Sequence, residues 1–247
     1  MAFPFTHLIV AYRVLDMQPV RPVRPARPAR PVSEKDAAMF LLGSLAPDAV
    51  HYRSEYRGAN MKNIGAAKKI THLCPVSDER WGSVTDNDGW FKNVQEFLLA
   101  HPKSAFAAGY AAHVLTDITN NRTLWDTFRK SFPAEAAKGY LSDYYTDLKN
   151  IDTRLYQETT ETKEIFRLLA KADASETISA WGNNEPLVTP EEIQAIQQNI
   201  LHEHFKNVPE KSPENPSKPQ KYYFVTFKNM LDYIQSAVEF VNDSVDI

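Results

Sequence analysis

A histidine and an aspartate lie one helical turn apart in one of the most apolar stretches of this 247-residue sequence. His113 and Asp117 belong to the run Gly-Tyr-Ala-Ala-His-Val-Leu-Thr-Asp at 109–117. On a helix, residues four apart share a face. Burying such a pair requires compensation. It is therefore either an ion-paired part of the core or two ligands of a metal ion, because imidazole plus carboxylate is a ligand set typical of zinc.

Three further segments place histidine or aspartate beside apolar sequence. Thr-His-Leu occurs at 6–8 near the start of a predicted helix and again at 71–73 at the end of another, and Leu-Ala-Pro-Asp-Ala-Val-His occupies 45–51. Each has a structural explanation when taken alone: a surface histidine in a first turn, or an aspartate that caps a helix after proline. Together they provide four imidazoles and two carboxylates. The candidate set is His7, Asp48, His51, His72, His113 and Asp117.

The order of these segments resembles a known family. Thr-His near the start, Leu-Gly-Ser-Leu-Ala-Pro-Asp at 42–48, Thr-His at 71–72 and the run at 109–117 are similar to the bacterial zinc-dependent phospholipase C family. That family shares an all-α fold with single-strand-specific zinc nucleases. The resemblance covers about residues 1–125, and the run at 109–117 is its most diagnostic part.

The resemblance implies a role for each matching residue. Asp48, His72, His113 and Asp117 correspond to the ligands of one zinc, and His7 with Asp117 to part of a neighbouring zinc site, so that Asp117 would bridge two ions. It also implies that Asp48 is both a ligand and a proton acceptor. The expected activity is hydrolysis of a phosphoric ester, such as a phospholipid, in which a zinc-bound water attacks a phosphodiester.

The sequence departs from the family after the 109–117 run, where family members carry further histidine and glutamate ligands. This chain has no histidine between His113 and His202. Asp143 and Asp147, with Asp152, are candidate replacements, although a solvated acidic helix face is the commoner arrangement. We therefore expect one or two ions. Near the motifs, His51 and Arg53 either contact a substrate phosphate or have structural roles.

Two other functions fit the same residues. The loss of the further ligands favours a non-catalytic, metal-stabilised helical binding module, whereas the four ordered segments favour an enzyme. The third alternative is a phosphodiesterase or nuclease acting on nucleotides or single-stranded nucleic acid. Few aromatic residues cluster with basic ones, which argues mildly against binding of single strands by base stacking.

Helical periodicity predicts the elements that must position these residues, and together they indicate a single all-α domain of about eight helices. Proline-rich loops are expected at 19–32 and 207–220. Strand-like alternation is confined to 221–227. The predicted helices span 6–16, 33–43, 60–71, 86–100, 104–118, 132–171 (one long helix, or two joined near Gly139 or Asn150), a segment from 189 onward, and 222–245.

Composition excludes several classes of protein. A net charge of −3, from 28 basic and 31 acidic residues, creates no strong field toward nucleic acid or membrane. The single Cys74 forms no internal disulfide, and only 8 glycines with no glycine-rich phosphate loop argue against a nucleotide-cradling enzyme. Without a signal segment or an apolar run of about 20 residues, we expect a soluble, cytoplasmic protein with no transmembrane segment.

An arginine tract stands apart from the predicted domain. Residues 19–31 repeat Pro-x-Arg with a period of three, which aligns Arg21, Arg24, Arg27 and Arg30 on one face of a polyproline helix. The tract is either a tolerated low-complexity loop or a weak contact for an anionic lipid surface, for nucleic acid, or for a partner that binds proline-rich segments.

Overall fold

The computed structural model describes a helical protein with one continuous hydrophobic core. Its described residues form twelve α-helices joined by turns and short 3-10 segments, with no β-strand among them. The prediction of an all-α fold is thus confirmed. The ranges that the structure describes are 3–17, 32–56, 64–75, 82–181, 185–208 and 222–245.

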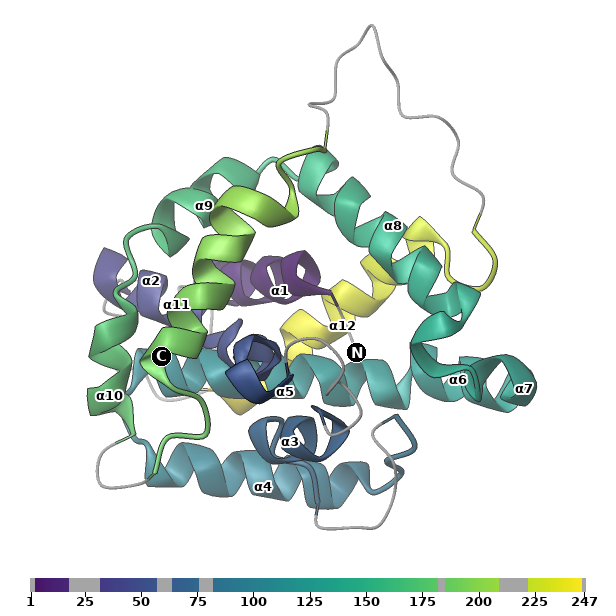
Figure 1. The fold of residues 1–247 in the computed structure, drawn as a ribbon, viewed down its shortest axis with the longest axis horizontal. Helices are drawn as coiled ribbons and strands as arrows, with labels where there is room; N and C mark the ends of the chain where they lie inside the picture. Colours follow the sequence, from purple (N-terminus) through teal and green to yellow (C-terminus); the bar gives the residue numbers. More distant parts are fainter. Residues whose placement is uncertain are drawn as a thin grey trace, which may run out of the picture.

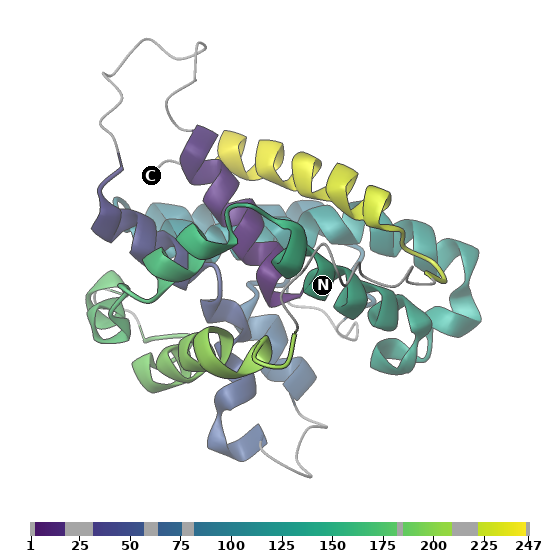
Figure 2. The same cartoon turned by 90° about the horizontal axis from the view of Figure 1, so that it is seen from above.

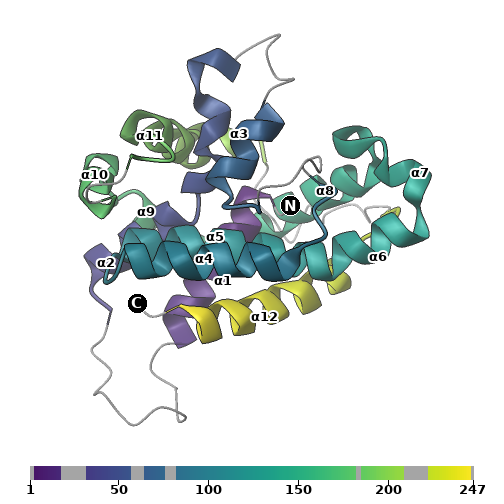
Figure 3. The same cartoon turned by 90° about the horizontal axis from the view of Figure 1, so that it is seen from below.

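Helix α5 (Ala105–Arg122) runs through the centre of the molecule (Figure 1). Every residue from Phe106 to Asn121 is buried, because the helix is covered on several sides at once. The elements packed against it are α1 (Pro4–Met17), α2 (Glu34–Gly43), α4 (Asn87–Ala100) and α12 (Phe227–Ser244). Figure 2 shows α12 beside α1, and Figure 3 shows α4 running along α5.

The closest of these contacts joins α2 to α5, backbone against backbone. A Cβ atom on Gly109 would lie 2.0 Å from the carbonyl oxygen of Phe40, and one on Gly43 would lie 2.1 Å from that of Phe106. No side chain fits in either place, so glycine is required at both positions. The crossing brings the residues that follow α2 directly onto the face of α5.

The segment after α2 continues into a short 3-10 helix, η2 (Ala46–Tyr52), which packs against α3 (Ile64–Thr71) and α11 (Pro190–Gln198). Pro47 lies in its first turn, where the missing N–H is tolerated. This arrangement places Asp48 and His51 between α3 and α11.

Capping residues start several helices where the sequence predicts a beginning. Ser33, Ser104 and Thr189 each accept a hydrogen bond from a backbone amide three residues on, in α2, α5 and α11. Asp86 does the same for α4. Such caps contribute about 1 kcal/mol each. At Thr189 the Glu192 side chain returns to the cap amide and completes a capping box.

Other boundaries differ from the sequence prediction. The first helix begins at Pro4, so Thr6 is not its cap. The predicted long helix over 132–171 is three: α7 (Pro133–Ala136), α8 (Asp143–Glu158) and α9 (Thr162–Leu169). Gly139, at φ 57°, lies in the break before α8, whereas Asn150 lies inside α8.

Two short helices were not predicted, α6 (Leu124–Ser131) and α10 (Thr177–Ala180). The last predicted helix begins later than expected, at Phe227 and not at Tyr222, and the strand-like residues 222–226 form neither helix nor strand. Their backbone amides are taken up instead by a buried carboxylate, because Tyr223, Phe224 and Val225 all donate to Asp147. The expected number of about eight helices was too low, because the described residues form twelve α-helices.

Both proline-rich loops lie mostly outside the described residues. Arg21, Arg24, Arg27 and Arg30 belong to the part that is not described, as does 209–221. Within the described ranges, no helix combines the length and the apolar character needed to cross a bilayer.

We expect Gly109→Ala to lower the free energy of unfolding by about 2 kcal/mol or more, because the new methyl group overlaps the Phe40 carbonyl. Gly139→Ala is the matched control. No atom lies within 4 Å of its added Cβ, so only the left-handed backbone at φ 57° costs stability, about 1 kcal/mol. Urea denaturation of both variants measures the difference. Equal effects would contradict the close contact of α2 with α5.

Candidate metal centre

The structure brings five of the predicted site residues into one buried cluster. The ligand atoms form two overlapping groups, each within 4.8 Å: His7, Asp48 and His113, and His72, His113 and Asp117. They come from α1, η2, the turn after α3, and α5. The side chains of His7, His72, His113 and Asp117 are at most 1% exposed. His113 and Asp117 are therefore not an isolated buried ion pair, since three further candidate ligands surround them.

Backbone carbonyls fix the orientation of two of the imidazoles. His113 Nδ1 lies 2.8 Å from the carbonyl oxygen of Ser44, and His72 Nδ1 lies 2.9 Å from that of Lys68. A carbonyl only accepts, so both Nδ1 atoms carry the proton and both Nε2 atoms offer a lone pair. This second layer of hydrogen bonds is typical of metal-ligating histidines.

The two Nε2 atoms face each other at 3.3 Å. With both protons on Nδ1, neither Nε2 has a proton to donate to the other, and a cation bound to both would remove the repulsion between their lone pairs. Bonds of about 2.1 Å that meet at a tetrahedral angle place neighbouring ligand atoms about 3.4 Å apart. Asp48 Oδ1 lies 3.4 Å from His72 Nε2, and Asp117 Oδ2 lies 3.7 Å from it and 3.9 Å from His113 Nε2.

His7 completes the cluster from the side of α1. Its ring stacks on that of His113 with centroids 3.6 Å apart. Neither ring nitrogen finds a hydrogen-bond partner within the described part of the chain, although both are buried. Asp117 Oδ1 is 3.7 Å from His7 Nε2, while its Oδ2 faces the other two imidazoles. The buried His7 ring has no hydrogen-bond partner among the described residues, and the two oxygens of Asp117 face different imidazoles. Both features fit a site for a divalent ion.

The protonation states of His7, His72 and Asp48 at pH 7 are compatible with binding a cation. Burial lowers the pKa of His7 well below its ordinary value and that of His72 to about 4, so both are neutral at pH 7. Burial opposes ionisation of Asp48, but the Lys68 ammonium and the imidazoles outweigh it and hold the pKa of that carboxyl well below its usual range. Two neutral imidazoles and an ionised carboxylate are the forms that bind metals.

Aromatic side chains hold the turn that carries His72. Tyr110 Oη donates to the carbonyl oxygen of Thr71, and Trp90 Nε1 donates to that of His72 at 2.6 Å. Leu73 follows with a left-handed φ of 55°. The turn is thus anchored to α5 and α4, and this fixes His72 in place.

Lys68 is a member of the site that sequence reasoning missed. Its Nζ lies 2.8 Å from Asp48 Oδ1 and 3.0 Å from His51 Nε2, and its side chain is only 4% exposed. The signal was present in the sequence, because Lys68 precedes His72 by four residues on a predicted helix and must share its face.

The site opens to solvent on one side. The side chain of Asp48 is 18% exposed and that of His51 is 35% exposed, and the two lie 3.7 Å apart. The sequence left two roles open for Arg53, a phosphate contact or a structural role. Its side chain pairs with Glu192 at 2.8 Å and donates to the carbonyl oxygen of Leu187. It therefore fastens η2 to α11.

The three acidic residues that were candidates for the additional family ligands have other roles or lie at the surface. Asp147 is fully buried, and its oxygens accept the backbone amides of residues 223–225. Asp152 accepts the amides of Phe5 and Thr6 and so anchors the start of α1. Asp143 is exposed at the first residue of α8. None of the three joins the groups of ligand atoms, because backbone donors occupy Asp147 and Asp152 and Asp143 lies at the surface.

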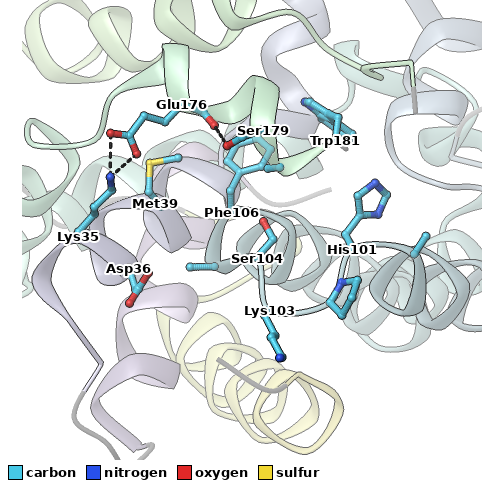
Figure 4. A pocket seen from close by; sticks show the side chains of 14 residues that line it. Lys35, Asp36, Met39, His101, Lys103, Ser104, Phe106, Glu176, Ser179 and Trp181 are labelled. Atoms are coloured by element: carbon cyan, nitrogen blue, oxygen red, sulfur yellow. Dashed lines mark hydrogen bonds and ion pairs between the residues drawn. The ribbon is translucent and has the colours of Figure 1, made fainter. Parts of the chain in front are cut away.

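A separate groove of about 600 Å³ lies at the N-terminal end of α5 and shares no lining residue with the cluster (Figure 4). Lys35 and Glu176 close one edge with an ion pair, and Lys103 and His101 lie near the other. Size alone does not mark the functional site here, since the groove gathers no comparable set of ligands.

Comparison with protein-family models, with curated proteins and with solved structures found no match to this chain.

We expect Zn²⁺ to stabilise the protein by about 3 kcal/mol at a free concentration 100 times its Kd, because only the folded chain assembles the cluster. His113→Gln should remove most of this gain. His204→Gln is the matched control, since His204 is exposed and outside the cluster. Thermal unfolding with and without the ion measures the shift. A shift that survives in His113→Gln would contradict the site.

We also expect Cys74 to resist iodoacetamide in the native protein at pH 8. Burial raises the pKa of its thiol, so little reactive thiolate forms. Because Cys74 follows His72 by two residues, a bound ion should slow the labelling further. In guanidinium chloride the single thiol should react fully. Mass spectrometry follows the modification, and fast labelling of the native chain would contradict the packing of this turn.

Proposed function

We propose that this protein is a metal-dependent phosphoric ester hydrolase, similar in its chemistry to zinc-dependent phospholipase C. One observation carries the proposal: four segments far apart in sequence place His7, Asp48, His72, His113 and Asp117 in one centre, with ligand atoms at metal-binding spacing. The oxygen and imidazole ligands favour zinc.

The exposure of the cluster supports a catalytic rather than a purely structural metal site. Structural sites are closed, whereas catalytic sites keep one side open for water and substrate. Here four ligand side chains are buried, and Asp48 alone reaches solvent, beside His51. A substrate would approach on that side.

When bound, a divalent ion lowers the pKa of water and neutralises phosphoryl charge. The chain supplies the rest of the chemistry. His72 and His113, held by their Nδ1–H bonds, keep the Nε2 atoms in fixed positions. Asp48 is ionised and lies at the open side, so its carboxylate is placed to accept a proton from an attacking water. In this proposal the substrate is a phosphodiester, for example a phospholipid. The proposal also places the protein in the cytoplasm.

A non-catalytic, metal-stabilised binding module is the second candidate. It is favoured by the assignment of Asp147 and Asp152 to backbone amides, which leaves the described residues with two overlapping groups of three candidate ligands that share His113.

Hydrolysis of bis(4-nitrophenyl) phosphate and of phosphatidylcholine distinguishes the two. We expect zinc-loaded protein to cleave at least one of them near pH 7, chelation to abolish the activity, and Asp48→Asn to lower kcat by about 100-fold or more. Asp143→Asn, at an exposed position, should leave kcat unchanged. Circular dichroism checks that each variant folds. Zinc binding with no hydrolysis of either ester would favour the binding module.

A further inference from the structure

Lys68 places a positive charge inside the candidate metal centre. Its side chain is 4% exposed, and its ammonium lies between Asp48 Oδ1 at 2.8 Å and His51 Nε2 at 3.0 Å. A buried ammonium is costly unless it is paired and hydrogen-bonded. The distances show that Asp48 pairs with it, so the same oxygen that faces His72 also faces a permanent cation of the chain.

The charges of the centre then limit what it can hold. Asp48 and Asp117 carry one negative charge each, Lys68 carries one positive charge, and neutral imidazoles carry none, which leaves a net charge of minus one. One divalent ion changes this to plus one. Two ions would leave plus three in a largely buried space, which is unfavourable without further anionic ligands.

The ligand geometry also favours a single ion. The two groups of ligand atoms share His113, whose Nδ1 is held by the carbonyl of Ser44. Its single remaining lone pair, on Nε2, serves one ion. The described residues therefore do not fill both groups at once.

We propose that Lys68 is the second cation of this centre: each chain holds one divalent ion, and the Lys68 ammonium neutralises the anionic group of the substrate at the open side. The proposal rests on the proposed function and adds a substrate preference. A phosphodiester carries one negative charge and makes the complex neutral. A phosphomonoester dianion leaves one negative charge uncompensated, so the diester is preferred.

Lys68 thereby supplies the positive charge that a second metal ion would otherwise supply. Its place beside Asp48, the most exposed residue of the cluster, and beside the partly exposed His51 puts that charge where a substrate enters. Asp48 holds it there, and His51 Nε2 accepts a second of its N–H groups.

Isothermal titration with Zn²⁺ tests the cation role without any substrate. We expect one ion per wild-type chain. Lys68→Met keeps the length of the side chain but removes the charge beside Asp48, so zinc should bind about tenfold tighter or more. Lys69→Met is the matched control, because the neighbouring residue loses the same charge from a partly exposed position. Its zinc affinity should not change.

Two ions per wild-type chain would overturn the proposal, and this measurement needs no variant. Unchanged or weaker zinc binding by a folded Lys68→Met would overturn it as well.

Kinetics test the substrate preference. For zinc-loaded protein we expect Lys68→Met to lower kcat/KM for bis(4-nitrophenyl) phosphate by about tenfold or more, and Lys68→Arg to restore part of the loss. Wild-type protein should cleave the diester faster than 4-nitrophenyl phosphate. Faster cleavage of the monoester would overturn the preference. If the wild type cleaves no ester, the proposed function fails, while the zinc titration still decides whether Lys68 is the second cation.

Discussion

The contact between the backbones of α2 and α5 is the constraint on which the rest of the site depends. Gly43 and Gly109 each lie where a Cβ would overlap a carbonyl of the other helix. This proximity carries the chain directly from α2 onto the centre of α5, so that the carbonyl oxygen of Ser44 meets His113 Nδ1. Gly43 and Gly109 thus help to set the tautomer and the direction of His113, a candidate ligand one helical turn after Gly109.

Burying this many polar and charged side chains in one place costs free energy. Three imidazoles and two carboxylates lie in an interior that a helical protein normally fills with leucine and alanine, and each polar atom there loses its hydration. The structure compensates part of that loss with backbone carbonyls on His72 and His113 and with Lys68 on Asp48. A cation bound near the facing Nε2 atoms and the buried His7 ring would compensate more of the loss.

The remaining buried acids show how similar residues take different roles. Asp147 and Asp152 lie one and a half turns apart on α8, and both are fully buried, yet neither joins the cluster. One gathers the amides that precede α12, and the other anchors the amides at the start of α1. They position the helix that carries His7 and the helix that covers α5. Their contribution to the site is therefore the placement of α1 and α12.

The sequence by itself determined the features that depend on neighbours along the chain. Helical spacing placed His113 and Asp117 on one face, capping residues marked the starts of α2, α4, α5 and α11, and the order of the histidine segments indicated which residues belong together. Only the tertiary structure decided that Lys68 lies against Asp48, that Arg53 pairs with Glu192, and that Asp147 serves backbone amides. The physical reason is that a helix fixes the direction of a side chain relative to its own turn, whereas the partner of a buried charge is whatever packing brings within about 3 Å of it.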